Sequence, residues 1–318
     1  MTNELRPRSI ADMPAQKPAE PATKAEARGR FFNTGNAFNV QLPPVPDRIF
    51  TEAARAALDP ASLTGLFACD ISQELACDFP ATTPLVLARY ARIRADETLH
   101  TDFAASGVIA YVIQGNGRTQ CRDETISWSE GDLFVLPGGV PADHAAGDAD
   151  AVLWIVTNEP QLSFEHLRPP APGQALTDIV HFRAAEISRQ IELIYDVGRD
   201  EQIAGSALIF SADRQEATRN ILPTLTVAMN SLPGGAVQRP HRHNSVAVSL
   251  IIKGDRCFSI VDGRRKDWAQ WATTITPPVS VHSHHNDGNE QAMFLIVQDG
   301  GIYYHARAMG FDFTEQPA

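Results

Sequence analysis

A block of short β-type segments occurs twice in this chain, the two copies lying about 140 residues apart. The segment VIQG at 112–115 matches IIKG at 251–254, and WIVT at 154–157 matches LIVQ at 295–298. Between these two matches, Leu136-Pro137 corresponds to Thr276-Pro277. Three matches in the same order at a nearly constant offset predict that one structural unit has been duplicated.

Each copy has the pattern of an antiparallel β-barrel or sandwich. Its segments are short, apolar or alternating, and rich in β-forming residues, and Gly, Asn, Asp and Pro separate them at short intervals. This pattern is typical of strands joined by tight turns. We expect a mostly all-β fold with strands at 85–93, 108–114, 132–136 and 151–157, then at 224–230, 245–252, 257–261, 273–276 and 292–298.

The segments outside the two copies differ in composition. The first 45 residues are rich in Pro, Ala, Lys and Glu, which predicts a loosely held tail. Short helices are expected at 46–59 and, after a proline-rich stretch, at 182–197. The predicted organisation is a tail (1–45), an N-terminal barrel (46–165), a linker with a helix (166–215) and a C-terminal barrel (216–318).

Charge and composition limit the partners of the chain. Its 318 residues carry a formal net charge of −11, which disfavours binding to nucleic acid or to an anionic membrane. No apolar stretch approaches the roughly 18 residues that a membrane helix requires. The four cysteines form no C-x-x-C pair and the N-terminus lacks the apolar segment of a secretory signal, so we expect a cytoplasmic protein.

Five of the ten histidines lie in two short segments of the second copy. His241 and His243 are two residues apart, so on a strand both side chains face the same side. Imidazole is the commonest metal-binding side chain, so this pair predicts half of a metal site. We expect His282 to supply the third ligand, with His284, on the same strand face, as the alternative.

The motifs around these histidines resemble those of the cupin family. A glycine lies six residues before the His-x-His pair, and a proline-led segment ends in VHSHHN. Cupins usually add a glutamate shortly after His-x-His, but HRHNSVAVSLIIKG contains no acid. The tripeptide His-Arg-His and the missing glutamate resemble the gentisate 1,2-dioxygenase group, whose members are two-cupin enzymes.

This resemblance implies a function. Members of the group bind Fe(II) with three histidines and use dioxygen to open salicylate-type rings between the carboxyl- and hydroxyl-bearing carbons. The implied substrate is a small aromatic acid such as gentisate or 5-nitrosalicylate, and the implied assembly is a homo-oligomer. The alternatives are another metal-dependent cupin enzyme (a lyase, isomerase or decarboxylase) and a cupin that binds a small molecule without turnover.

Two features depart from the group. The metal motif lies in the second barrel rather than the first, and Ser249 stands where the group tends to have an arginine that pairs with the substrate carboxylate. Another residue must then bind this carboxylate. Candidate substrate-binding residues are Gln238, Arg239 and Arg242, and candidate catalytic residues are His284, His285 and Asp287, while Trp268 and Trp271 are expected in the core.

The first barrel is expected to be structural and free of metal. By the sequence offset, Asp102, Ala104 and Asp143 fall near the positions equivalent to His241, His243 and His282. The alternative is a second, weaker metal site formed by His100, Asp102 and His144.

Overall fold

The computed structural model describes residues 8–38, 40–171, 173–197 and 205–315, and it divides the chain into two compact units. The first unit ends at Pro44 and contains a 3-10 turn at Ile10–Asp12 and the short helix α1 (Lys24–Ala27). An isolated antiparallel bridge between Gln16 and Phe31 joins the segments before and after α1. The second unit begins at Val45 and contains every other element described below.

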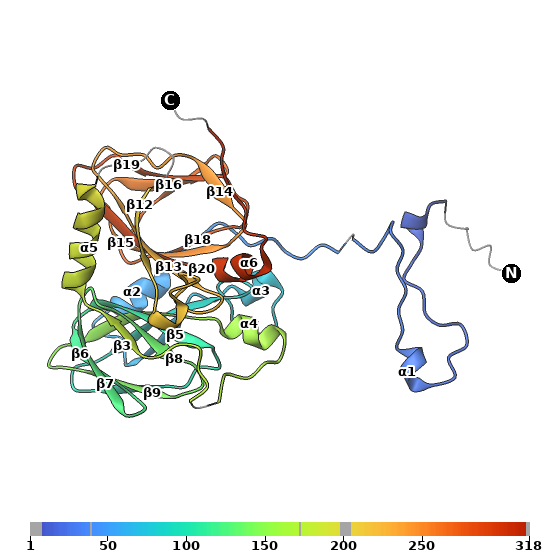
Figure 1. The fold of residues 1–318 in the computed structure, drawn as a ribbon, viewed down its shortest axis with the longest axis horizontal. Helices are drawn as coiled ribbons and strands as arrows, with labels where there is room; N and C mark the ends of the chain where they lie inside the picture. Colours follow the sequence, from blue (N-terminus) through green and yellow to red (C-terminus); the bar gives the residue numbers. More distant parts are fainter. Residues whose placement is uncertain (1–7, 39, 172, 198–204, 316–318) are drawn as a thin grey trace. The chain divides into compact units, whose positions relative to one another are not determined.

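The second unit holds two barrels, each made of one large and one small antiparallel sheet (Figure 1). The large sheets have the strand orders β11-β8-β5-β10-β3-β2 and β1-β18-β15-β20-β13-β12. The N-terminal barrel contains β2 (Gly65–Ala68), β3 (Leu87–Ile93), β4 (Thr98–Thr101), β5 (Gly107–Gln114), β6 (Asn116–Cys121), β7 (Glu124–Ser129), β8 (Leu133–Pro137), β9 (Ala142–Ala146), β10 (Ala151–Thr157) and β11 (Val180–Phe182). The C-terminal barrel contains β1 (Arg48–Phe50), β12 (Ser206–Phe210), β13 (Thr226–Leu232), β14 (His241–His243), β15 (Ala247–Lys253), β16 (Cys257–Val261), β17 (Arg264–Asp267), β18 (Thr273–Thr276), β19 (His282–Asn286), β20 (Ala292–Gln298) and β21 (Phe311–Phe313).

The two barrels repeat one strand order, which confirms the predicted fold of two β-barrels with a short helical connection. In each large sheet the corresponding strands β5 and β15 lie between equivalent neighbours. Even an irregularity is repeated, since the register shifts at Ile113 in β5 and at the corresponding Ile252 in β15. Such a bulge bends a strand, and it occurs here at the same point of both copies.

The main hydrophobic core lies where the two large sheets face each other. Alternate side chains of each strand point to this shared layer, as period-two geometry requires. The layer contains Tyr90 and Trp154 of the N-terminal barrel and Val248 and Leu250 of the C-terminal barrel, all at most 1% exposed. The opposite faces of the same strands line the interior of each barrel.

Three strands of the large sheets lie where the predicted boundaries placed something else: β1 falls in the predicted N-terminal barrel, and β11 and β12 fall in the predicted linker. β1 pairs with β18 of the C-terminal barrel, although it precedes the N-terminal barrel in the chain. This corrects the helix predicted over 46–59, which begins only at Glu52, as α2 (Glu52–Leu58). The helix predicted over 182–197 is α5 (Ala184–Asp196), because Phe182 ends β11.

The remaining helices are short. They are α3 (Ser72–Leu75), α4 (Glu159–Phe164), the 3-10 turn Asp213–Gln215 and α6 (Gly300–Ala306). Among the described residues, no helix is both long and apolar enough to cross a membrane. All four cysteines are free.

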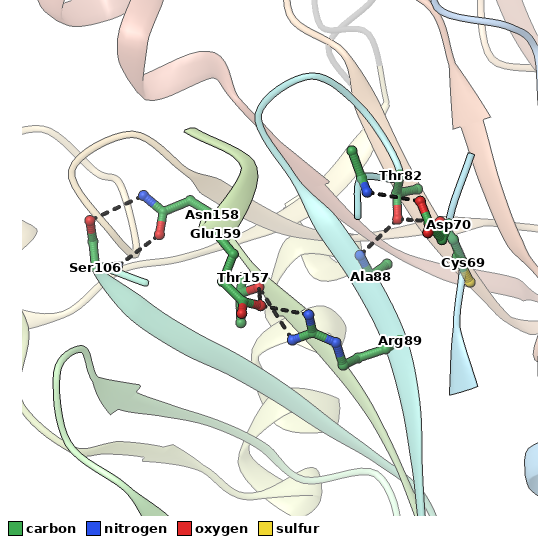
Figure 2. A network of polar contacts seen from close by, with 10 residues as sticks. Cys69, Asp70, Thr82, Ala88, Arg89, Ser106, Thr157, Asn158 and Glu159 are labelled. Atoms are coloured by element: carbon green, nitrogen blue, oxygen red, sulfur yellow. Dashed lines mark hydrogen bonds and ion pairs between the residues drawn. The ribbon is translucent and has the colours of Figure 1, made fainter. Parts of the chain in front are cut away.

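A buried arginine fills part of the N-terminal barrel (Figure 2). Arg89 is 6% exposed and forms an ion pair with Glu159 at 2.5 Å, and Thr157 donates to the same carboxylate at 2.7 Å. The guanidinium also lies over the ring of Phe103, 4.4 Å from its centroid. Because a buried charge is tolerated only when it is paired, this contact set holds β3, β10 and α4 together.

Candidate metal centre

Three imidazole rings converge inside the C-terminal barrel. His241 and His243 lie on β14 and His282 lies opposite on β19, where it is the ladder partner of His241. One ring nitrogen from each lies within 4.8 Å of the corresponding nitrogens of the other two, and all three residues are buried. The sequence-predicted trio is therefore brought together by strand parity within β14 and by register between β14 and β19.

The backbone fixes the tautomer of all three rings. Each Nδ1 lies 2.9–3.0 Å from a backbone carbonyl oxygen two residues away: that of Arg239 for His241, Ser245 for His243 and Ser280 for His282. A carbonyl can only accept, so each Nδ1 carries the proton and each Nε2 keeps a free lone pair. Such hydrogen bonds behind the ring are the usual support of metal-binding histidines, and this donor set fits a divalent ion.

Burial keeps these rings neutral. It lowers the pKa of His241 to about 4 and that of His282 to about 3, and it also lowers the pKa of His243. Neutral imidazole is the form that binds metal. Three neutral ligands would leave the whole charge of a divalent ion available to a bound anion.

The trio lies in the wall of a cavity of about 310 Å³, at the lower end of the size range of ligand sites. One wall is formed by β14 and β19 and the other by the inner face of the large sheet. Among the residues that the structure describes, none that lines this cavity is an acid, a lysine or an arginine. The polar residues that share it with the trio are Thr226, Asn230, Gln238, Ser245, Ser249, Thr276, His284, Gln298 and Tyr304, and the larger apolar ones are Ile209, Ile296, Met309 and Phe311.

Two of the residues predicted to bind substrate or to act in catalysis line this cavity. Gln238 is 8% exposed and lines it, and so does His284, which is two residues from His282 and faces the same side of β19. The Nδ1 of His284 lies 2.8 Å from the hydroxyl oxygen of Ser259, and its ring packs edge-on against Phe294. Burial lowers its pKa well below the usual value, so His284 is a neutral residue beside the trio.

The other predicted side chains lie away from the cavity. His285 points to the opposite face of β19, where its ring stacks on Phe258 at 4.6 Å, and Asp287 is exposed. Arg242 forms a half-exposed ion pair with Asp312 at 3.2 Å. The structure therefore gives these three residues no place beside a ligand of the trio.

Arg239 packs against the ring of Phe313 on β21. Its guanidinium carbon is 3.2 Å from the centroid of the Phe313 ring, and its buried Nε has no hydrogen-bond partner within the described part of the chain. Arg239 does not line the cavity. Trp268 and Trp271 both pack against the core, as expected, although the indole of Trp268 also reaches Ser259.

Two contacts of the trio were not expected from the sequence. Phe311, on β21, stacks on His241 with ring centroids 5.3 Å apart, and Gln298 places its amide nitrogen 3.2 Å from Nε2 of His243. The alternation in Phe311-Asp312-Phe313 indicates a strand with both rings on one face, and this pattern could have suggested the first contact. Nothing in the sequence near Gln298 indicates the second.

The N-terminal barrel has different residues at the equivalent positions. The ladder pair Thr101 and Ala142 occupies the place of His241 and His282, so the sequence-based alignment to Asp102 and Asp143 was wrong by one residue. On a strand, a shift of one residue moves a side chain to the other face. His243 then corresponds to Phe103 rather than to Ala104, and Arg89 corresponds to Ala228 of the cavity wall.

The alternative metal site of the N-terminal barrel is not assembled. His100 is exposed and lies 2.7 Å from Asp143, on the outer face of its strand. His144 points inward and contacts the hydroxyls of Thr101 and Thr119 with its two ring nitrogens. His100 and His144 therefore lie on opposite faces of the sheet.

Comparison with known proteins finds one family model and several relatives that match part of the chain. A family model described as an AraC-like ligand binding domain matches residues 87–172. The 5-aminosalicylate 1,2-dioxygenase of Comamonas sp is 34% identical over 102 residues, which cover 30% of this chain and 27% of the relative. The gentisate 1,2-dioxygenase of Ralstonia sp is 32% identical over 82 residues, covering 26% of this chain and 23% of the relative. The aligned segments thus span about a quarter of the length of these relatives.

A solved structure matches over nearly the whole length. The salicylate 1,2-dioxygenase of Pseudaminobacter salicylatoxidans superposes with a TM-score of 0.72 at 14% identity, covering 90% of this chain and 93% of that one. A variant of that enzyme, solved in complex with gentisate, superposes with a TM-score of 0.70. At this identity the likeness establishes the fold. The chain is a two-cupin protein with the fold of salicylate 1,2-dioxygenase.

Proposed function

We propose that this protein is an Fe(II)-dependent dioxygenase that opens the ring of a salicylate-type aromatic acid between its carboxyl- and hydroxyl-bearing carbons. The observation that carries the proposal is the convergence of three Nε2 lone pairs on a cavity whose described lining contains no acidic side chain. The named activities of the partial relatives, and the gentisate bound to the structural relative, support the same chemistry.

His241, His243 and His282 would hold the metal ion. Their Nδ1 protons are already bound to the backbone, so each Nε2 presents its lone pair to the cavity. The amide of Gln298, now beside Nε2 of His243, would turn to the cavity when that nitrogen binds metal. Iron in this place would supply the redox chemistry by which dioxygen reacts with an aromatic ring.

The substrate would be a small anion whose charge is balanced by the metal ion. The described residues that line the cavity include no lysine or arginine, and on these residues the carboxylate would be oriented by neutral donors. Gln238, Gln298 and Asn230 are the amides in reach, and Ser249 stands where the gentisate group tends to have its arginine. A neutral wall of this kind accommodates different ring substituents.

The overall reaction balances without a further reductant. Both atoms of dioxygen enter the product, one bond between two ring carbons breaks, and the ring opens to a dicarboxylate. Dioxygen is the oxidant and the ring is oxidised. The protein orients the acid and limits the access of water, since Ile209, Ile296, Met309 and Phe311 line the rest of the cavity.

An oxygen-electrode screen of the Fe(II)-loaded protein tests this function. Gentisate, salicylate, 5-aminosalicylate, 5-nitrosalicylate and 1-hydroxy-2-naphthoate are offered in turn, with benzoate and 3-hydroxybenzoate as controls that lack an ortho hydroxyl. We expect oxygen uptake with at least one 2-hydroxy acid, together with a ring-opened product by mass spectrometry. Absence of uptake with all five acids, in protein shown to contain iron, would refute the proposal.

We also propose that the chain is cytoplasmic and assembles with copies of itself, and that the N-terminal barrel, predicted over 46–165, holds no metal. Assembly is supported by the N-terminal unit, which leaves the rings of Phe31, Phe32 and Phe38 at least 58% exposed. The barrel is proposed as metal-free because Thr101, Phe103 and Ala142 stand in place of the three histidines. Light scattering would test the assembly, and metal analysis of the same sample, with one ion expected per chain, would test the metal-free barrel.

A further inference from the structure

The N-terminal barrel contains a chain of hydrogen bonds that passes through a buried histidine. Trp128 Nε1 lies 2.9 Å from Thr119 Oγ1, which lies 2.8 Å from His144 Nδ1. On the other side of the ring, His144 Nε2 lies 3.1 Å from Thr101 Oγ1, and Thr101 donates to the carbonyl oxygen of Ala142 at 3.3 Å. His144 and Thr119 are fully buried.

The direction of this chain follows from its two ends. The indole N–H can only donate and the carbonyl oxygen can only accept. Thr101 uses its single proton on Ala142, so it must accept from His144 Nε2. His144 is neutral, because burial lowers its pKa to about 4, and it has one N–H. That N–H is therefore on Nε2, and Nδ1 accepts the proton of Thr119.

The C-terminal barrel repeats the first half of this chain. Trp268 Nε1 lies 2.8 Å from Ser259 Oγ, which lies 2.8 Å from His284 Nδ1. The three residues match Trp128, Thr119 and His144 at a constant offset of 140 residues. The hydroxyl of Ser259 has no other partner within the described part of the chain, so it accepts from Trp268 and its one proton is directed to Nδ1.

In the C-terminal barrel, the cavity takes the place of the second half of this hydrogen-bond chain. The position of Thr101, the acceptor in the N-terminal barrel, is occupied by the metal-site residue His241. Among the described residues nothing hydrogen-bonds to His284 Nε2, and the ring lies 5.8 Å from that of His282. The C-terminal copy thus ends in a donor without a protein acceptor.

We infer that Ser259 and Trp268 are positioning residues that hold His284 in the Nε2–H tautomer and so present a neutral hydrogen-bond donor to the ligand of the metal centre. The three metal-site histidines have the opposite tautomer, with the proton on Nδ1. Two histidines of one strand thus have different roles: His282 directs a lone pair at the metal, whereas His284 directs an N–H at the metal's ligand. On the proposed function, the acceptor is a carboxylate or hydroxyl oxygen of the aromatic acid, and this last step alone depends on that function.

Histidine nitrogen NMR on the full-length, metal-free protein tests the inference without any assay of activity. With ¹⁵N-histidine labelling, we expect His284 and His144 to carry their proton on Nε2, and His241, His243 and His282 on Nδ1. His284→Gln and His144→Gln assign the two signals. A proton on Nδ1 of His284 in the wild-type protein would overturn the inference, whether or not the protein proves to be a dioxygenase.

Two substitutions at Ser259 make the test specific. Ser259→Thr copies the N-terminal barrel and should keep the Nε2–H tautomer, whereas Ser259→Ala should give a mixture of tautomers at His284 and leave His144 unchanged. An unchanged His284 in Ser259→Ala would contradict the inference. If that variant does not fold, Trp268→Phe replaces it, with a mixture again expected and an unchanged tautomer again contradictory.

A kinetic measurement extends the test to the active protein. With Fe(II) bound, Ser259→Ala should lower kcat about 10- to 100-fold, the usual effect of losing the hydrogen bond behind an active-site histidine, while Ser259→Thr stays within about threefold of wild type. Metal content should be equal in the two variants. Equal kcat values in both, with the tautomer changed in Ser259→Ala, would overturn the donor role of His284.

Discussion

At the scale of single residues, the candidate site depends on the strand geometry of histidines. Parity places His241 and His243 on one face, and register places His282 opposite. The shared face of His241 and His243 was predictable because parity is a local property of a strand. The position of His282 was predictable because a barrel brings the second histidine segment beside the first. The positions of His285 and Asp287 follow from the same parity rule, since residues that alternate with the inward-facing His282 and His284 point outward.

The first prediction concerns the metal ligands. His243→Ala should reduce the metal content from about one divalent ion per chain to nearly none, because two ligands seldom retain a metal that three hold. Elemental analysis of protein reconstituted without oxygen measures this. The control is His305→Ala, which removes an exposed histidine on α6. Full metal content in His243→Ala would show that the centre lies elsewhere.

A second prediction concerns the buried carboxyl of Asp299. Burial raises its pKa to about 6, although Val246 N donates to it at 2.9 Å. The folded state then holds a proton on this carboxyl between about pH 4 and 6 that the unfolded state releases, so the contribution of Asp299 to stability is greatest below pH 4 and is lost as the pH rises through 6. Asp299→Asn should remove this dependence and raise the free energy of unfolding at pH 7 by up to about 3 kcal/mol.

Urea unfolding of the metal-free protein between pH 4 and 8 measures the effect of Asp299→Asn. Asparagine keeps an oxygen that can accept from Val246, whereas Asp299→Ala loses it and should not show the full gain. Parallel pH profiles for the wild-type protein and Asp299→Asn would mean that the carboxyl is not the source of the pH dependence.

At the scale of elements, β14 depends on its neighbours. It has three residues and pairs with β19 through His241 alone, but with β21 through all three. A chain ending after Gly310 lacks β21 and the stacking of Phe311 on His241. We expect about tenfold weaker metal binding, because an unsupported strand orients its ligands less well. Competition with a chromophoric chelator measures this affinity.

Two control chains accompany the truncation of β21. A chain ending after Glu315 keeps the whole strand and should bind metal as tightly as the full chain. Arg242→Gln removes only the half-exposed ion pair with Asp312, which should contribute little. If the chain ending after Gly310 binds metal with unchanged affinity, β21 has no role in supporting the site.

Elements with strong local patterns were predicted well, and elements set by distant pairing were not. β10 and β20 are continuous apolar runs, and they form where the sequence indicates. β1, β12 and β21 are short, and only their partners make them strands. The one-residue error in aligning the barrels has the same origin, because the turns before β4 and β14 differ and only pairing across the sheet fixes the register.

At the scale of the whole second unit, the two barrels are joined by a strand that crosses between them and by a common core. The chain begins in the sheet of the C-terminal barrel with β1, forms the N-terminal barrel, closes it with β11 and then returns. The main core contains side chains from both large sheets. The C-terminal sheet is therefore incomplete without β1, and neither barrel has a complete core by itself, so we expect the two barrels to unfold together.

The polar centre of this shared core gives the last prediction. Thr273 Oγ1 lies 2.9 Å from Trp154 Nε1 and 2.8 Å from the hydroxyl of Tyr90, so one C-terminal side chain binds two residues of the N-terminal barrel. Thr273→Val would leave the buried indole N–H without a partner, at a cost of about 2 kcal/mol. In calorimetry we expect one transition, shifted as a whole to lower temperature, while the exposed Thr98→Val has little effect. Two separate transitions, with only one of them displaced, would show that the barrels fold independently despite their common core.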